Sequence, residues 1–534
     1  MVVFSTAIGC CSFLLQHRSF KITFAVMDHW CRRPASFANF SVEEWMWLAI
    51  PRDDQNEHSR CLVRHPPGGG YRSHVVACSS WEFDLTPYGP NAVSEWNLVC
   101  DRAWLLSLVK VVYSTICIVA LMVAGTAADH IGRRTVILLT IPAVLIAGVA
   151  STRPEGFYFF VAVRSIVSAA TSALLPPLFV LLYEVSPTHK FAIYQSLVAL
   201  ACIILIPATL LLAALGRTGW ASYQIKLLAP TFPTFFLFCA VDESPAWLMA
   251  RGFVSDAERV CSRAARINNI RLAHSYEQAT LQHPRPWERA EREERNWLCA
   301  PRYLVRTIFI CYMSVVITFV FFAFVLNETI QTNLRTKLVS IVLSAVVVVS
   351  VLLYLPFFGP KRVVVVSGLL LSSASIGLAG TYTPEETLSR DVFFVVMRVS
   401  VIVAMAVLFV LILGLYSVTA RGTAYGVGMS CLIVGDMIAQ TIPSREHFKK
   451  LLLAGTALAT ALSVAAAEYL PEEMEGPAQH RKSFADTRSS ALIAAYSMRS
   501  MQETLEPLPK GPVKARSSRT PLSSNIKSRK SRSR

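Results

Sequence analysis

Four ionisable residues lie inside long apolar stretches of the sequence and are the first candidates for chemistry. They are Lys110, Arg164, Arg398 and Asp436. A charge inside a lipid bilayer is costly, so a charged residue there is a functional candidate by default. Arg398 can bind a carboxylate through two hydrogen bonds, and Asp436 can neutralise an organic cation. The four residues predict a binding site for a small organic ion.

Each of these residues also has a second interpretation. The long stem of Lys110 allows its ammonium to extend to the membrane surface. Arg164 is equally consistent with a structural hydrogen-bond donor between helices. Arg398 and Asp436 can pair with each other, which would leave the surrounding cavity nearly neutral. Two tyrosines are candidates either for cation–π contacts with a substrate or for packing alone, namely Tyr223 and Tyr354.

A second group of charged residues lies in the segment 125–134, which reads GTAADHIGRR. Its two glycines, Gly125 and Gly132, permit a tight turn. Asp129 lies at the expected end of a helix, and Arg133 and Arg134 follow it. Such a loop can form ion pairs between helices that latch one state of a transporter. The alternative is a loop that is merely basic.

The elements that must position these residues are membrane-spanning helices. Only 16% of the 534 residues are charged and 53% are hydrophobic, whereas a soluble chain carries about a quarter charged residues. A run of about 20 apolar residues crosses the bilayer as a helix. Eleven such runs are found, at 104–127, 135–152, 156–184, 191–215, 222–241, 303–326, 337–358, 363–382, 391–418, 423–443 and 449–470.

A twelfth run at 4–27 is interrupted by polar residues, namely Gln16, His17, Arg18 and Lys21. A signal peptide is the alternative interpretation, but its charges should precede the apolar stretch and here they follow it. We therefore interpret 1–27 as a degenerate first transmembrane helix.

The net charge of +16 is sorted by loop, which argues against nucleic acid as a partner. Residues 471–534 carry 13 Lys and Arg against 6 Asp and Glu, and residues 28–103 carry 7 against 10. The short loops at 129–134 and 359–362 are also basic. The positive-inside rule places the basic loops and the tail in the cytoplasm and 28–103 outside. This orientation requires an odd number of crossings before residue 28.

The outer loop 28–103 contains four cysteines, for which two disulfides in any of three connectivities are expected: Cys31, Cys61, Cys78 and Cys100. Asn39 begins a glycosylation sequon in this loop, and Asn327 begins a second one at the outer end of a span. The segment 242–302 divides the spans and is expected to form short cytoplasmic helices, with Ser255 as an N-cap. The tail 471–534 is expected to be disordered and basic.

Several motifs are similar to those of one transporter family. The segment 125–134 resembles the signature loop of the major facilitator superfamily, G-x-x-x-D-x-x-G-R-R. The other motifs are similar to those of the organic cation, carnitine and organic anion transporters of solute carrier family 22. They occur in the same order as in that family, and the resemblance covers residues 25–480. These motifs are DHWCR at 28–32, WEFD at 81–84, EWNLVCD at 95–101, EVSPTHK at 184–190, DESPAWLMARG at 242–252 and YLPEEMEG at 469–476.

This resemblance implies an all-α polytopic membrane protein with twelve, or eleven, transmembrane helices. They would form two six-helix halves, 1–241 with the outer loop and 303–470, around a central cavity that opens alternately to each side. Glu184, Glu243 and Arg421 are implied to act in the gate with the signature loop. The partners implied are the bilayer, a small organic ion, and a coupling ion (H⁺ or Na⁺) or an exchanged dicarboxylate. The expected location is the plasma membrane.

The second half departs from the family pattern. The loop at 358–362 reads FGPKR and lacks the acidic residue. At 414–421 the chain reads GLYSVTAR where the family favours E-L-Y-P-x-x-x-R, so Gly414 replaces a glutamate. These losses leave open a member that no longer transports and serves as a receptor or scaffold. A sugar porter is disfavoured, because spans 337–358 and 391–418 lack Gln and Asn. No phosphate-binding loop or metal-ligand spacing is found, so we expect no enzyme, cofactor or metal.

Overall fold

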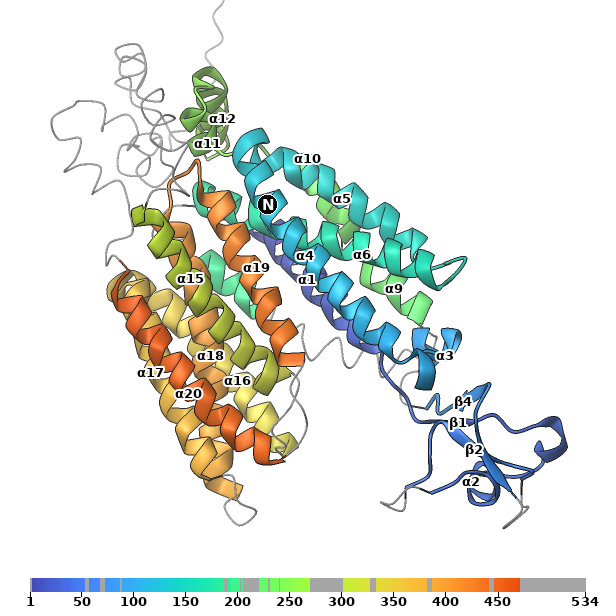
Figure 1. Ribbon diagram of the computed structural model, residues 1–534. Coiled ribbons are helices and arrows are strands. Elements are labelled where there is room, and N and C mark those ends of the chain that lie inside the picture. The colour runs from blue at the N-terminus through green and yellow to red at the C-terminus, as the bar shows by residue number, and fades with distance from the viewer. Residues whose placement is uncertain are drawn as a thin grey trace, which may run out of the picture.

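The computed structural model describes residues 2–52, 57–67, 73–86, 89–186, 191, 193–201, 204, 220–228, 231–239, 241–268, 301–326, 333–381, 387–440 and 446–470. Within these residues, nine helices are long and apolar enough to cross a membrane. These helices and several shorter ones form two groups that lie side by side, with a small domain beyond one end (Figure 1). Most of the predicted span 191–215 and Asn327 lie outside the described residues.

The first group holds the N-terminal helices, which are α1 (Val2–Thr23), α4 (Trp104–Ile131), α5 (Arg133–Ala150), α6 (Phe157–Ala173), α7 (Leu175–Val185), α9 (Trp220–Leu228) and α10 (Phe232–Cys239). The predicted span 4–27 is thus helical to Thr23, and α1 packs against α6 and α7. The predicted span 156–184 consists of two helices. Pro176 and Pro177 lie in the first turn of α7, where proline is tolerated because those backbone N–H groups need no helical partner.

The second group holds the C-terminal helices, which are α15 (Pro301–Val320) with a π-helical end at Phe321–Leu326, α16 (Leu334–Phe358), α17 (Pro360–Gly380), α18 (Thr387–Leu415), α19 (Arg421–Gln440) and α20 (Glu446–Glu468). All six predicted spans of this half correspond to these helices. Apolar side chains on α16, such as Val342 and Val346, are more than half exposed. This surface suits contact with lipid tails, since the backbone polar groups along the middle of a helix are paired within the helix.

The outer domain is built from two small antiparallel sheets, in which β1 (His29–Cys31) pairs with β4 (Trp81–Phe83) and β2 (Leu62–His65) pairs with β3 (His74–Ala77). Helix α2 (Val42–Ala49) packs Trp45 and Ala49 against β1 and β2. Helix α3 (Ala92–Trp96) lies where this domain meets the bundle. Trp220 of α9 holds α3 in place, since its indole N–H donates to the Glu95 carboxylate at 2.7 Å.

Two short helices follow the first group at the predicted cytoplasmic end, α11 (Pro245–Ala250) and α12 (Val254–Ile267). Short helices were expected in this segment. The predicted N-cap at Ser255 is wrong, because α12 begins at Val254 and Phe253 occupies the cap position. Ser244 instead caps α11 by accepting a hydrogen bond from the backbone N–H of Trp247 at 3.3 Å.

The two groups meet most closely along α4 and α19 (Figure 1). Glycines on both helices let the backbones approach: a Cβ at Gly426 would lie 2.5 Å from the Leu121 carbonyl oxygen and 3.3 Å from the Gly125 Cα. The Ser430 hydroxyl donates to the Ile118 carbonyl at 3.3 Å farther along. Small residues at helix crossings are typical of membrane bundles. This crossing brings Asp129 to the start of α19.

Candidate gate and binding residues

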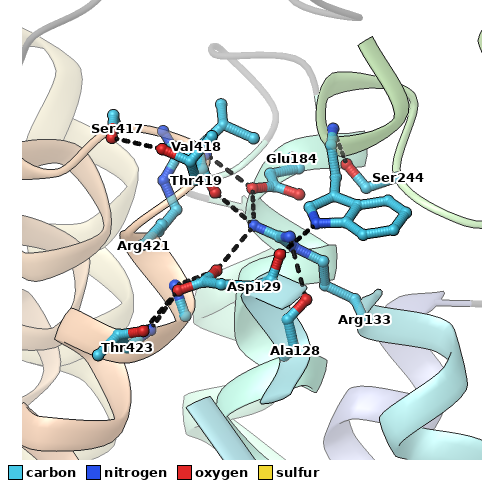
Figure 2. Close-up of polar contacts among 12 residues, drawn as sticks. Ala128, Asp129, Arg133, Glu184, Ser244, Ser417, Val418, Thr419, Arg421 and Thr423 are labelled. Atoms are coloured by element: carbon cyan, nitrogen blue, oxygen red, sulfur yellow. Dashed lines mark hydrogen bonds and ion pairs between the residues drawn. The ribbon is translucent and has the colours of Figure 1, made fainter. Parts of the chain in front are cut away.

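Asp129 of α4 joins the two groups of helices (Figure 2). Its carboxylate accepts hydrogen bonds from the backbone N–H groups of Gly422 at 3.0 Å and Thr423 at 2.7 Å, and from the Thr423 hydroxyl at 2.8 Å. The first N–H groups of a helix have no partner within the helix and form the positive end of its dipole. Asp129 therefore caps α19 from the opposite half of the molecule.

Glu184, at the end of α7, contacts one arginine from each half (Figure 2). Its Oε1 lies 3.1 Å from Arg133 Nη2 and 2.9 Å from Arg421 Nη1. Arg133 is fully buried and lies 3.2 Å from the Asp129 carboxylate, and it also donates to the Val418 carbonyl. Charges this deep are stable only when they are paired and hydrogen-bonded. The predicted gating residues Asp129, Arg133, Glu184 and Arg421 thus form one cluster.

Glu243 caps the start of α5. Its carboxylate accepts from the backbone N–H groups of Arg133 at 3.1 Å, Arg134 at 3.0 Å and Ser244 at 2.9 Å. Burial raises the pKa of the Glu243 carboxyl, although the hydrogen bonds from Ser244 and Arg134 act in the opposite direction. Gly132 precedes α5 with φ +103°, and a Cβ there would lie 2.5 Å from the Glu243 carboxylate. Glycine is therefore required at this position for both backbone and space.

The end of α4 is held by the segment that follows the first group of helices. The Asp129 carbonyl accepts from the Trp247 indole at 2.8 Å and from Arg251 Nη2 at 2.7 Å. Arg134, a predicted gating residue, donates to the Cys239 carbonyl at 3.1 Å. Hydrogen bonds to the final carbonyls of a helix satisfy groups that lack helical partners. The sequence did not suggest Trp247 and Arg251 as parts of this cluster beyond their place in the 242–252 motif.

Arg164 is buried inside the first group of helices. It donates to the side chains of Gln16 and Ser19 on α1, and to the Gln16 carbonyl at 3.2 Å. Gln224 of α9 donates to the same Gln16 side-chain oxygen at 3.0 Å. These contacts correspond to the structural interpretation of Arg164, that of a donor between helices. Its predicted role in substrate binding stays a prediction.

Asp436 is fully buried on α19 and faces α1. Its Oδ2 lies 3.3 Å from His17 Nε2, and the Gln440 amide donates to the same oxygen at 2.7 Å. Sequence reasoning treated His17 only as an interruption of an apolar run and missed this contact. The adjacent polar residues Gln16 and His17 in an otherwise apolar helix were the available signal.

The remaining predicted binding residues lie in different surroundings. Lys110 is exposed near the start of α4, as expected for a side chain that extends to the surface. Tyr354 is 59% exposed on α16 beside Phe357, on a surface that suits lipid contact. Arg398 is half-buried in the middle of α18, and the side chain of Tyr223 lies outside the described residues. The roles of these residues in binding stay predictions.

In the outer domain the four cysteines lie as two pairs. Cys31 and Cys78 have Cα atoms 5.6 Å apart, and those of Cys61 and Cys100 are 5.7 Å apart. Both separations suit a disulfide, and of the three possible connectivities the structure contains this one. Asn39 is exposed just before α2, whose N-cap is Ser41 of the sequon. Its glycosylation stays a prediction.

A family model for the Major Facilitator Superfamily matches residues 103–440. Human solute carrier family 22 member 13 is 29% identical over 247 residues, 44% of this chain and 44% of that protein. The Drosophila melanogaster beta-alanine transporter is 27% identical over 289 residues, 47% of this chain and 46% of that protein. The chain thus spans about half the length of these two curated relatives. Solute carrier family 22 member 6 of Rattus norvegicus is 22% identical over 483 residues, 86% of each protein.

Two solved structures share this fold. The proton:xylose symporter XylE bound to 6-bromo-6-deoxy-D-glucose matches with a TM-score of 0.60 at 16% identity, over 88% of this chain and 96% of that one. A double tryptophan mutant of XylE matches with a TM-score of 0.51 at 18% identity, over 74% of this chain and 90% of that one. Identities this low show the fold alone. The predicted fold class and the resemblance to solute carrier family 22 are confirmed.

Proposed function

The chain belongs to the major facilitator superfamily and is a multi-pass membrane protein, and from this we propose that it is a secondary carrier of small organic ions that works by alternating access. The similar proteins of solute carrier family 22 and the beta-alanine transporter support this proposal. So does the arrangement of helices in two groups that meet along α4 and α19. The plasma membrane is the proposed location.

The gate cluster is the observation that carries the proposal. Asp129, Arg133, Glu184 and Arg421 connect the two halves at the end that the positive-inside rule assigns to the cytoplasm. In this state the cytoplasmic ends are held together. Asp129 is joined to Gly422 and Thr423, and Glu184 to Arg421, by hydrogen bonds and an ion pair, and such contacts can break and re-form as the halves rock. A protein that only needed a fixed bundle would gain nothing from buried charges here.

The substrate is proposed to be charged because charged residues lie within the membrane-spanning helices. Asp436 can neutralise a cation and Arg398 can bind a carboxylate, so organic cations, zwitterions and anions are the substrate class. A coupling ion, H⁺ or Na⁺, or an exchanged dicarboxylate, would drive the cycle. No catalytic step is proposed.

A test is uptake by purified protein in lipid vesicles, with tetraethylammonium as the cation and p-aminohippurate as the anion. Asp129→Asn removes the charge that caps α19. A hydrogen bond to a charged group contributes about 1.5–3 kcal/mol, so uptake should fall about tenfold or more. The matched control is Asp256→Asn, which removes a surface carboxylate of α12 paired with Arg259. Wild-type vesicles that take up neither probe above protein-free vesicles would refute the proposal.

A second candidate is a member of the superfamily that does not transport. It is favoured by the second half, where Gly414 stands in place of a glutamate and Lys361 contacts Glu468 at 3.4 Å instead of an acidic residue of its own loop. That protein would reach the cell surface and bind through its outer domain without any uptake. The vesicle experiment separates the two candidates.

A further inference from the structure

The contact between His17 and Asp436 joins the two halves away from the gate. His17 lies on α1 in the first half and Asp436 on α19 in the second, with His17 Nε2 3.3 Å from Asp436 Oδ2. The His17 side chain is 11% exposed and that of Asp436 is 1% exposed. Asp436 lies fifteen positions after Arg421 on α19, about 22 Å along the helix at 1.5 Å a residue. The gate residues therefore do not share in this contact.

Aromatic rings from both halves surround the His17 imidazole. Its ring centroid lies 6.0 Å from that of Phe13, 6.5 Å from that of Tyr113 and 5.7 Å from that of Phe322. Aromatic faces and a carboxylate are the groups that bind organic cations in proteins. The imidazole thus occupies a place whose surroundings suit an organic cation.

Several charged or ionisable residues lie on the helices around His17 and Asp436. Their types indicate which of them can gain or lose a proton near neutral pH. On α4, Tyr113 lies beside the His17 ring, and Cys117 is hydrogen-bonded to Ser168 one turn further along. Arg164 of α6 donates to neutral acceptors on α1, and Arg398 lies on α18, a helix that packs against α19. Arginine stays charged at any physiological pH, and free tyrosine and cysteine titrate well above pH 7. Histidine alone among these residue types has an ordinary pKa near neutrality, at about 6.5.

We propose that His17 and Asp436 form a proton-binding pair for which an organic cation competes, so that the carrier exchanges one proton for one monovalent organic cation. This inference rests on the proposed function. With the proton bound, the imidazolium neutralises Asp436 across the halves. When a substrate cation pairs with Asp436, the imidazolium releases its proton to water and His17 is left neutral. One positive charge replaces another, so the exchange is electrically neutral.

Vesicles containing the purified full-length protein test this with tetraethylammonium. With the lumen one pH unit more acidic than the bath, one-for-one exchange should raise steady-state accumulation about tenfold, since a tenfold ratio is worth about 1.4 kcal/mol. A membrane potential set with potassium and valinomycin should not change the accumulation. A pH indicator in the lumen should report alkalinisation when tetraethylammonium is added outside.

Two variants separate the proton from the cation. His17→Gln removes the imidazole of the proposed pair, so uptake should persist but lose its dependence on the pH gradient and follow the membrane potential. Asp436→Asn should abolish uptake of the cation. His74→Gln, on an exposed strand of the outer domain, is the control and should keep the tenfold response. Elution of each variant as a single species on size exclusion shows that it is folded.

The wild-type protein decides the question even where a variant does not fold. Uptake of tetraethylammonium that follows the potential and ignores the pH gradient would overturn the proton exchange and leave the carrier function standing. Uptake of p-aminohippurate without tetraethylammonium would overturn the cation site and also leave that function standing. Uptake of neither probe would remove the proposed function and this inference together.

Discussion

Asp129 and Glu243 use their carboxylates in the same way at two different helices. Asp129 accepts from the first backbone N–H groups of α19, and Glu243 accepts from those of α5. Neither helix is preceded by a residue whose side chain can accept a hydrogen bond, because Gly132 precedes α5 and Ala420 precedes α19. A distant carboxylate that replaces a local cap makes the start of each helix depend on tertiary contacts. Changes at these single residues should therefore propagate to a whole helix.

Gly132→Ala should destabilise the protein more than the matched change at Gly359. Both glycines have positive φ, +103° and +77°, so alanine is strained at either by about 1–3 kcal/mol. At Gly132 the added Cβ would also lie 2.5 Å from the Glu243 carboxylate, whereas nothing lies within 4 Å at Gly359. Thermal unfolding of the purified variants in detergent measures the difference. An equal loss in the two variants would show that the contact with Glu243 does not matter.

The pKa of Glu243 gives the stability of this region a pH dependence. Burial raises that pKa above the usual 4.5, so on acidification the folded protein binds this proton more readily than the unfolded chain. This carboxyl therefore stabilises the folded protein at low pH, and that stabilisation is lost as the pH rises through its folded pKa. As the pH falls from 7 to 4.5, the melting temperature of the wild type should rise relative to that of Glu243→Gln. Glu155→Gln serves as the control, because Glu155 is an exposed residue in the short loop between α5 and α6.

At the scale of elements, the crossing of α4 and α19 depends on glycine. A Cβ at Gly125 would meet backbone atoms of Gly422 and Gly426, and a Cβ at Gly426 would meet those of Leu121 and Gly125. The sequence contained both glycines, but its helical patterns gave no sign that these two helices are partners. They lie far apart in the chain, and each apolar helix has several faces that suit either lipid or protein. Only the Asp129 loop at the end of α4 indicated a contact at that end.

Gly426→Ala should weaken closure of the cytoplasmic end. Its Cβ would meet the Leu121 carbonyl oxygen at 2.5 Å, and overpacking of this kind costs about 1–3 kcal/mol. A change of about 2 kcal/mol shifts an equilibrium about thirtyfold, so uptake in vesicles should fall severalfold. Gly455→Ala in α20 is the control, because nothing lies within 4 Å of the added Cβ there. Equal uptake by both variants would contradict a role for this crossing.

Helix positions were largely predictable and helix breaks were not. Long apolar runs gave all six helices of the second group. The predicted span 156–184 is divided after Ala173 into α6 and α7. Hydropathy averages over a window and does not register a local break. The gate residues followed from motifs, whereas the contact of His17 did not, because its partner Asp436 lies on α19 in the other half, far away in the sequence.

On the scale of the whole molecule, the gate is unequal between the two halves. Glu184 of the first half contacts an arginine from each half, while the second half has Gly414 where the family carries a glutamate. Glu184 is thus shared by both arginines, and Arg133 also contacts Asp129 of the first half. The closed cytoplasmic end depends on the first half for its negative charges.

A double-mutant cycle measures this coupling between halves. Glu184→Gln leaves Arg133 and Arg421 buried without their shared counter-charge, and loss of one partner of a buried pair costs about 3–5 kcal/mol. Arg421→Gln removes one of those arginines, so the double variant should lose less than the sum of the singles, with a coupling of about 0.5–3 kcal/mol. Thermal unfolding in detergent provides the values. Additive losses would show that the two residues act independently.

The polar face of α1 has a consequence for how the protein is made. Gln16 and Ser19 would be costly in lipid, and in the finished protein they are covered by Arg164. That arginine is synthesised 148 residues after Gln16. While α1 leaves the ribosome, Arg164 is not yet present to cover Gln16 and Ser19, so we expect stable insertion of α1 to depend on α6. Membrane insertion of this chain is in that sense a joint event, in which a late helix determines whether the first one stays.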